Sequence, residues 1–222
     1  MSVPSTGANG VISIKDSSGT IIWNWHMWVW ANDLSTVSIK SEAGATYKIL
    51  PYNLASKWDS SETSIKNWFY QWGRSVPMLC PSAYNSTDNH ARFGTLGFTT
   101  APVARTYNQG IANPTTFYYN TMSPYNWFGN TSYYNLWDAN CTKVGTSDNV
   151  TVKTVYDPCP PGFKIPNGNT FTGFNTYNMS YWDSGYTWNG TFFPASGYRD
   201  KYDGLLGAVG SESSVLTSAV HS

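Results

Sequence analysis

The sequence predicts a domain of the α+β class that is rich in β-strands and in long irregular loops. Two segments, 11–30 and 187–200, have the alternating apolar pattern and the turn residues of β-hairpins. One segment, 59–74, has apolar residues at helical spacing. Between them lie long stretches rich in Pro, Gly, Asn and Thr, which are typical of loops.

Composition narrows the class of protein further. Aromatic residues make up 17% of the 222 residues and charged residues only 12%, against about a quarter in an average soluble domain. This balance is typical of an extracellular, loop-rich protein. The net charge is zero and there is no basic run, so we expect no nucleic-acid partner. No apolar run reaches 18 residues, so we expect no membrane insertion.

We expect residues 1–10 to form a flexible lead-in and residues 11–222 to form a single domain. The first ten residues, MSVPSTGANG, lack the charged and apolar regions of a signal peptide. An exported protein would therefore carry its signal outside this sequence.

The N-terminal hairpin is predicted to have strands at 11–15 and 20–30, joined by a turn over 16–19. A strand turns alternate side chains to opposite faces, which places Ile21, Trp23, Trp25, Met27 and Val29 on one wholly apolar face. We expect Trp23 and Trp25 to be buried in the core on this basis. His26 lies on the other, mixed face, where a hydrogen-bonded structural role is expected.

The segment 59–74 is predicted to be a helix. Asp59 and Glu62 have the spacing of a capping box at its N-terminus. An apolar face follows at Ile65, Trp68, Phe69 and Trp72. We therefore expect Trp68 and Trp72 to belong to the core.

The remaining elements are shorter. Residues 77–109 are expected to be irregular, and a short helix or turn is expected around Pro114. Residues 151–166 are predicted to be a strand that enters a turn shaped by three prolines around Cys159. In the 187–200 hairpin, Asn189 and Gly190 are the expected turn residues.

Six strings occur in order along the chain: GTIIWNWHMWV, FYQWGR, NPTTFY, NLWD, TVYDPCPPGFKIP and FPASGYRD. Together they resemble surface proteins of gut Bacteroidetes, namely fimbrillin-like tip or adhesin domains related to the major paralogous domain of Fibrobacter. The resemblance runs from Gly19 to the C-terminus. It implies a C-type lectin-like domain with small antiparallel sheets, two short helices and long irregular loops that carry the ligand site. Variable proteins of diversity-generating retroelements are among the relatives.

The resemblance also bears on the end of the chain and on its cysteines. Relatives continue past the SVLTSAVHS region, so the resemblance implies a domain truncated at its C-terminus. A late cysteine of these relatives could pair with the equivalent of Cys159. The spacing of Cys80, Cys141 and Cys159 matches no zinc or redox pattern, and leaves both free thiols and a single disulfide open.

No catalytic string is present, and we expect no enzymatic activity. The three histidines, His26, His90 and His221, lie outside any recognisable triad or metal motif. An enzyme of the formylglycine-generating type remains an alternative, and it would require a reactive cysteine pair. We expect no cofactor and no metal. Calcium is the alternative left open, because Trp137–Asn140 loosely resembles an element of calcium-dependent lectins.

Binding by loops is the function that the sequence favours. Residues 123–135 and 174–188 mix aromatic side chains with Asn, Ser and Gly, as antibody paratopes do. The candidate ligand-binding residues are Tyr125, Trp127, Tyr133, Tyr134, Tyr177, Tyr181, Trp182, Asp183 and Tyr186. The alternative for these aromatics is that they anchor the loops to the core.

We therefore expect an extracellular module on a bacterial cell surface, an adhesin or pilus-tip domain that binds a glycan or protein ligand on a host or bacterial surface. The alternative is a structural fimbrial subunit whose partner is another pilus subunit.

Overall fold

The computed structural model describes residues 8–29, 34–54, 68–78, 99–102, 106–121, 127, 133–142, 149–182 and 185–219. Most strands pair with their neighbour along the chain: β1 (Ala8–Lys15) with β2 (Ile21–Val29), and β3 (Val37–Lys40) with β4 (Thr46–Ile49). In the same way β5 (Phe69–Tyr70) pairs with β6 (Pro77–Met78), and β7 (Thr99–Pro102) pairs with β8 (Thr116–Tyr119). Near the C-terminus, β12 (Tyr198–Arg199) pairs with β13 (Leu206–Gly207). The strands β9 (Ser180–Trp182) and β11 (Thr191–Pro194) flank β10 (Gly185–Trp188).

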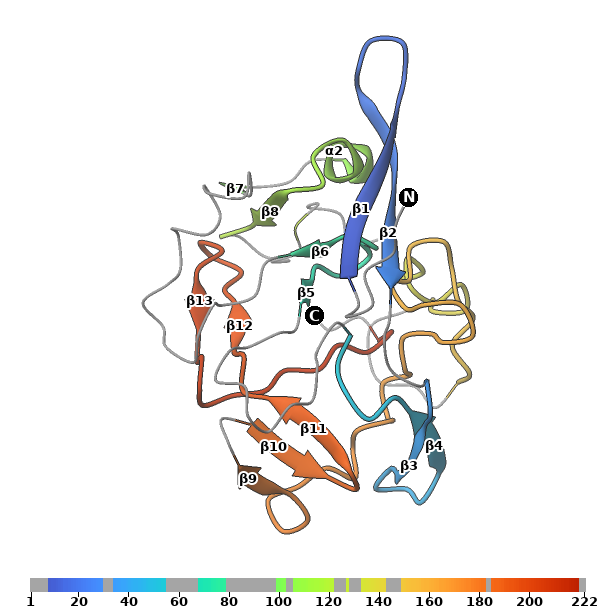
Figure 1. Ribbon diagram of the computed structural model, residues 1–222, viewed down its shortest axis with the longest axis vertical. Helices are drawn as coiled ribbons and strands as arrows, with labels where there is room; N and C mark the ends of the chain where they lie inside the picture. The colour runs from blue at the N-terminus through green and yellow to red at the C-terminus, as the bar shows by residue number, and fades with distance from the viewer. Residues whose placement is uncertain are drawn as a thin grey trace.

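Within this part of the chain the architecture is a set of small sheets with one short helix, α2 (Tyr107–Ala112). All the strand pairs are antiparallel except β7–β8, which is parallel. Figure 1 shows the β1–β2 hairpin projecting from one end of the molecule and the β9–β11 sheet near the other end. The predicted small antiparallel sheets and long loops are confirmed at this level.

The N-terminal hairpin is confirmed, with a longer first strand than predicted, because residues 8–10 of the expected lead-in belong to β1. The pairing sets Ile12 opposite Trp25. The turn is closed by Asp16, whose carboxylate accepts hydrogen bonds from the backbone N–H groups of Ser18 and Thr20. The bond from the Ser18 hydroxyl and these backbone bonds lower the pKa of Asp16.

The prediction that Trp25 is buried is wrong, because its side chain is 48% exposed. Asn24, on the opposite face, is buried instead: its amide donates to the Ile111 carbonyl at 2.7 Å and accepts from the Ser13 hydroxyl. Trp23 is only partly buried and lies against Tyr156, with ring centroids 5.7 Å apart. Both faces of β2 thus contact the rest of the protein, so the alternation of apolar residues does not decide which side chains are buried.

The predicted helix is also wrong where the structure describes it. Residues 59–67 lie outside the described residues, and Phe69 and Tyr70 form strand β5, opposite Met78 and Pro77. A turn follows, closed by the bond from Arg74 N to Gln71 O. The helical spacing of apolar residues does not produce a helix in these described residues, because the buried Arg74 needs hydrogen-bond partners from distant segments.

Arg74 is 3% exposed and lies between α2, β8 and the aromatic core. Its guanidinium donates to the side chain of Gln71 and to the carbonyls of Gly110, Asn113, Pro114 and Thr116. It also lies over the ring of Trp127, 5.4 Å from the centroid. The described partners include no carboxylate, and burial lowers the pKa of Arg74 to about 10.

The turn expected around Pro114 is confirmed and leads into β8, whereas α2 begins within the segment 77–109 that was expected to be irregular. Thr106 caps α2: its hydroxyl accepts from Gln109 N while the Gln109 side chain accepts from Thr106 N, a capping box. The carbonyls at the end of the helix, which have no partner within it, are taken by Arg74.

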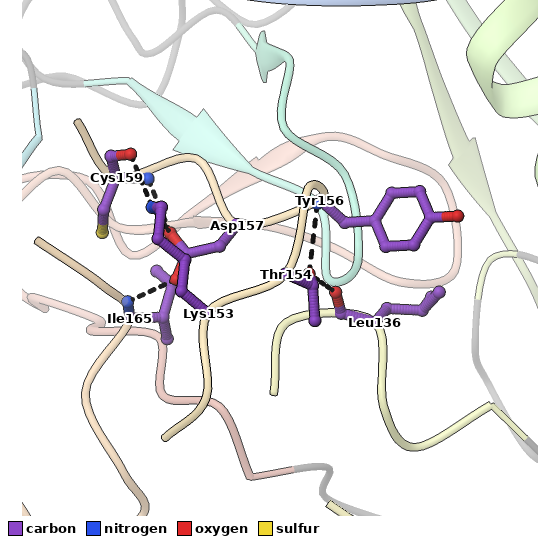
Figure 2. Close-up of polar contacts among 7 residues, drawn as sticks. All are labelled: Leu136, Lys153, Thr154, Tyr156, Asp157, Cys159 and Ile165. Atoms are coloured by element: carbon purple, nitrogen blue, oxygen red, sulfur yellow. Dashed lines mark hydrogen bonds and ion pairs between the residues drawn. The ribbon is translucent and has the colours of Figure 1, made fainter. Parts of the chain in front are cut away.

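The segment 151–166 is not the predicted strand, since only Lys153 forms an isolated bridge, to Asp138. Side chains hold the backbone here instead (Figure 2). The Asp157 carboxylate accepts from Cys159 N, Ile165 N and the Lys153 ammonium at 2.7–2.9 Å. The expected proline-shaped turn is therefore braced by one buried carboxylate rather than by strand pairing.

Among the described residues, buried apolar side chains gather in three clusters around Trp127 and Leu136, around Ile39, Trp188 and Phe193, and around Met78 and Phe117. The predicted 187–200 hairpin, which supplies Trp188 and Phe193 to the second cluster, is confirmed as β10–β11. Its second strand ends at Pro194, and Tyr198–Arg199 pair with β13 instead. Its turn residues Asn189 and Gly190 have φ angles of 47° and 77°, the left-handed values that this tight turn requires.

We expect Arg74→Met to lower the free energy of unfolding by at least about 3 kcal/mol, because it leaves several buried carbonyls without a donor. Urea denaturation measures this change. Lys40→Met, on the exposed side of β3, is the control and should stay within about 0.5 kcal/mol of the wild type. An Arg74→Met protein as stable as the control would contradict the role given to Arg74.

Stability is expected to fall in acid because of His26. Burial lowers the pKa of His26 to about 4, from 6.5, and its Nδ1 lies 3.2 Å from the Tyr70 hydroxyl. Between these two pH values the unfolded chain binds a proton that the folded chain does not. The free energy of unfolding therefore decreases as the pH falls from 6.5 to 4, by up to about 3 kcal/mol.

The measurement is denaturation at a series of pH values for the wild type and His26→Gln. The difference between the two curves isolates His26 from the carboxylates, and it should shrink toward pH 4. Parallel curves across this range would contradict the assignment.

Candidate functional site

The sheet β9–β10–β11 positions a row of aromatic side chains that runs from the core to the surface. Its register places Tyr186 opposite Phe193 on one side and opposite Tyr181 on the other. Residues directly opposite one another in an antiparallel sheet share a face. Phe193 is buried, Tyr186 is partly buried, and Tyr181 is 57% exposed, so the row ends at the surface.

Both tyrosines of this row are fixed in position. The Tyr181 hydroxyl donates to the Gly210 carbonyl at 2.9 Å, and the Tyr186 hydroxyl donates to the Ser211 carbonyl at 2.8 Å. Their ring centroids lie 5.2 Å apart with the planes at 72°. The exposed ring of Tyr181 is therefore fixed by its hydrogen bond and by its contact with the Tyr186 ring. This reduces the conformational entropy lost when a ligand binds.

The turn that precedes β9 presents a third tyrosine. Tyr177 is 98% exposed. Two asparagines brace the turn below it: the Asn175 side chain accepts from Tyr177 N at 2.9 Å, and the Asn178 amide donates to the Gly173 carbonyl at 2.7 Å. A wholly exposed aromatic side chain on a braced backbone is unusual in a core-anchoring role and is suited to contact with a ligand.

The turn is seated closely on the sheet β3–β4. A Cβ atom at Gly173 would lie 2.0 Å from the backbone oxygen of Lys40, so only glycine fits. Phe174, the next residue, packs edge-on against Trp188 and Phe193 in the core. The turn is thus anchored in the core by Phe174, while its other end, which carries Tyr177, is exposed.

The other predicted site residues are placed differently. Tyr133 is half-exposed and Tyr134 is partly buried. The segment 133–142 that holds them lies on the right of the view in Figure 1, whereas β9 and β10 lie at the lower left. The structure therefore does not gather the predicted residues into one surface.

Trp127 corrects the sequence prediction directly. It is 5% exposed, its indole N–H donates to the Trp72 carbonyl at 2.7 Å, and Tyr118 stacks on it at 6.0 Å. Its ring faces are occupied by the protein, so it serves the core rather than a ligand. Tyr125 and Asp183 lie outside the described residues, and of Trp182 the structure describes only its backbone in β9.

Among the titratable groups of the described segments, Cys159 bears on the formylglycine-generating alternative, which requires a reactive cysteine pair. Burial and the neighbouring Asp157 raise the pKa of Cys159, which is the opposite of what a reactive thiolate needs. Cys159 forms no disulfide, and Cys80 lies outside the described residues. This arrangement gives no support to the formylglycine-generating alternative.

The described residues also hold no group of three or more His, Cys, Asp or Glu side chains suited to a metal ion. In the segment that loosely resembled a calcium element, Asp138 is buried and accepts hydrogen bonds from Val152 N and Asn140 N. That carboxylate oxygen braces a turn.

One feature that the sequence analysis missed is a cavity of about 930 Å³. Its walls come from β4, β5, β8, β11, β12 and the segments 163–171 and 214–219. No local pattern could have found it, because its lining residues are contributed one or a few at a time by segments far apart in the chain.

Compared with known proteins, the chain matches no family model, no curated sequence and no solved structure. Among the helical residues that the structure describes, none forms a helix long and apolar enough to cross a membrane.

We expect Gly173→Ala to destabilise the protein by about 1–3 kcal/mol, since the added methyl group must push the turn away from β3. Thermal unfolding measures the effect. Gly10→Ala is the matched control, because a Cβ at Gly10 meets nothing within 4 Å. Equal melting temperatures for the two variants would show that the turn is not seated as described.

Proposed function

We propose that this chain is a non-enzymatic binding module of a bacterial cell surface, an adhesin or pilus-tip domain of the C-type lectin-like class. It recognises a glycan or protein ligand through the surface formed by Tyr177 and Tyr181, with β9 as its base. The proposal joins the family resemblance of the six sequence strings to the geometry of the tyrosine surface.

The observation that carries the proposal is Tyr177, 98% exposed on a turn braced by Asn175 and Asn178. Exposure leaves both ring faces accessible for stacking on a sugar or packing against a protein side chain. Bracing means that little conformational freedom is lost on binding. The surrounding segment 174–188 mixes Tyr and Trp with Asn and Ser, the composition of paratopes.

The alternative, a structural subunit that packs against another subunit, is supported by a different surface. The outward face of the β1–β2 hairpin carries four half-exposed apolar side chains, Ile12, Ile14, Trp25 and Met27. Contiguous apolar surface of this kind is typical of protein contacts. It lies on the projecting hairpin, away from the β9–β11 sheet (Figure 1).

The test is a glycan and mucin array run with and without calcium. Tyr177→Ala and Tyr181→Ala are each expected to weaken binding about tenfold, the loss of a contact worth about 1.4 kcal/mol. Tyr181→Phe keeps the ring and should bind more tightly than Tyr181→Ala. Calcium is expected to have no effect.

Tyr202→Ala removes an exposed tyrosine from another turn and serves as the control. Binding that survives Tyr177→Ala and Tyr181→Ala unchanged would overturn the proposed site. A blank array, together with self-association that Trp25→Ser abolishes, would favour the structural subunit instead.

A further inference from the structure

The cavity of about 930 Å³ is separate from the tyrosine surface, because none of Tyr177, Tyr181 and Tyr186 lines it. Its volume lies at the upper end of the range of about 300–1,000 Å³ found for small-molecule sites. The cavity is partly open to solvent, so a small molecule can enter it.

Most of the cavity wall is apolar or aromatic. β4 and its following residue contribute Ile49 and Leu50, β5 contributes Phe69, and the C-terminal segment contributes Leu216. Buried Phe117 and Phe193 close other parts of the wall. A wall of this kind favours an apolar ligand body, whose removal from water is the main source of affinity.

The charges around the cavity are all of one sign. Its described lining includes Lys48, Lys164, Arg199 and Lys201 and contains no Asp or Glu, although the whole chain has 13 acidic and 13 basic residues. These four side chains give the described lining a net positive charge. That charge favours a ligand that carries negative charge.

Two of these cations are held where an anion could reach them. Lys164 donates to the Thr151 carbonyl at 2.6 Å, which fixes its ammonium and leaves two further donors. Arg199 donates to the Gly204 carbonyl at 3.0 Å and lies over the Phe69 ring, 6.0 Å from its centroid. Arg199 thus meets the apolar wall directly, at Phe69.

We propose that this cavity binds an amphipathic anion, a molecule with an apolar chain or ring body and one acidic head group. The apolar body lies against the wall formed by Ile49, Phe69 and Leu216. The head group is bound by Lys48 and Lys164, while Arg199 and Lys201 add to the attraction by their charge. This site is independent of the proposed adhesin surface and could be present whether or not that surface binds a glycan.

The test uses two naphthalene dyes of similar size: the anionic 1-anilinonaphthalene-8-sulfonate and the neutral N-phenyl-1-naphthylamine. The anionic dye is expected to bind at a single saturable site, and laurate is expected to displace it. In Lys48→Gln/Lys164→Gln the affinity for the anionic dye should fall about tenfold, while the affinity for the neutral dye stays unchanged. Lys40→Gln, on the strand paired with that of Lys48, should alter neither affinity.

Because such dyes also bind partly unfolded chains, each protein is first shown to unfold cooperatively and to have native near-ultraviolet circular dichroism. Leu216→Trp, which narrows the cavity at its wall, should weaken binding of both dyes while unfolding stays cooperative. Dye binding that does not saturate, that is unchanged in Leu216→Trp, or that is unchanged in Lys48→Gln/Lys164→Gln would overturn the proposal. So would the absence of binding by the folded wild type.

Discussion

The described part of the structure depends on the guanidinium of Arg74, which is removed from water and satisfied by backbone carbonyls. The end of α2, the turn before β8 and the start of β8 each present a carbonyl to it. Trp127 packs over its face and closes it from solvent. A buried cation without an ion-pair partner is costly unless its hydrogen bonds are filled. The need to fill them sets the positions of these segments and leaves Gln71 and Arg74 in a turn rather than in a helix.

Other polar side chains also bond to backbone groups where the sheets are too short to fix the conformation of the chain by themselves. Asp157 braces the proline-rich turn, Asn24 attaches the N-terminal hairpin to α2, and Asn175 with Asn178 shapes the turn below Tyr177. Two-stranded sheets are marginal alone. Hydrogen bonds from polar side chains to backbone groups therefore fix the chain where strand pairing would do so in a larger sheet. Several of these side chains are Asn, which gives the abundance of Asn a structural role.

The two proposed sites follow from how aromatic residues are divided between core and surface. On the β9–β11 sheet the aromatic row continues outward past the core, so that the exposed Tyr181 is held by residues already packed. In the cavity the aromatic wall faces inward and meets cations at its margin. The first arrangement suits a large ligand that docks on a surface, and the second suits a small molecule that enters a cavity.

The sequence by itself determined the elements that rest on local chemistry: the hairpins at 11–30 and 187–200, the turns at Asp16 and Asn189–Gly190, and the loop-rich class. The exposure of Tyr177 and Tyr181 agrees with the loop composition. Only the tertiary structure decided which face of β2 is buried, that Phe69 and Tyr70 form a strand, and that Trp127 belongs to the core. The physical reason is that local periodicity describes one segment at a time. Burial of Asn24, Arg74 and Trp127 depends on partners that lie 36 to 87 residues away along the chain.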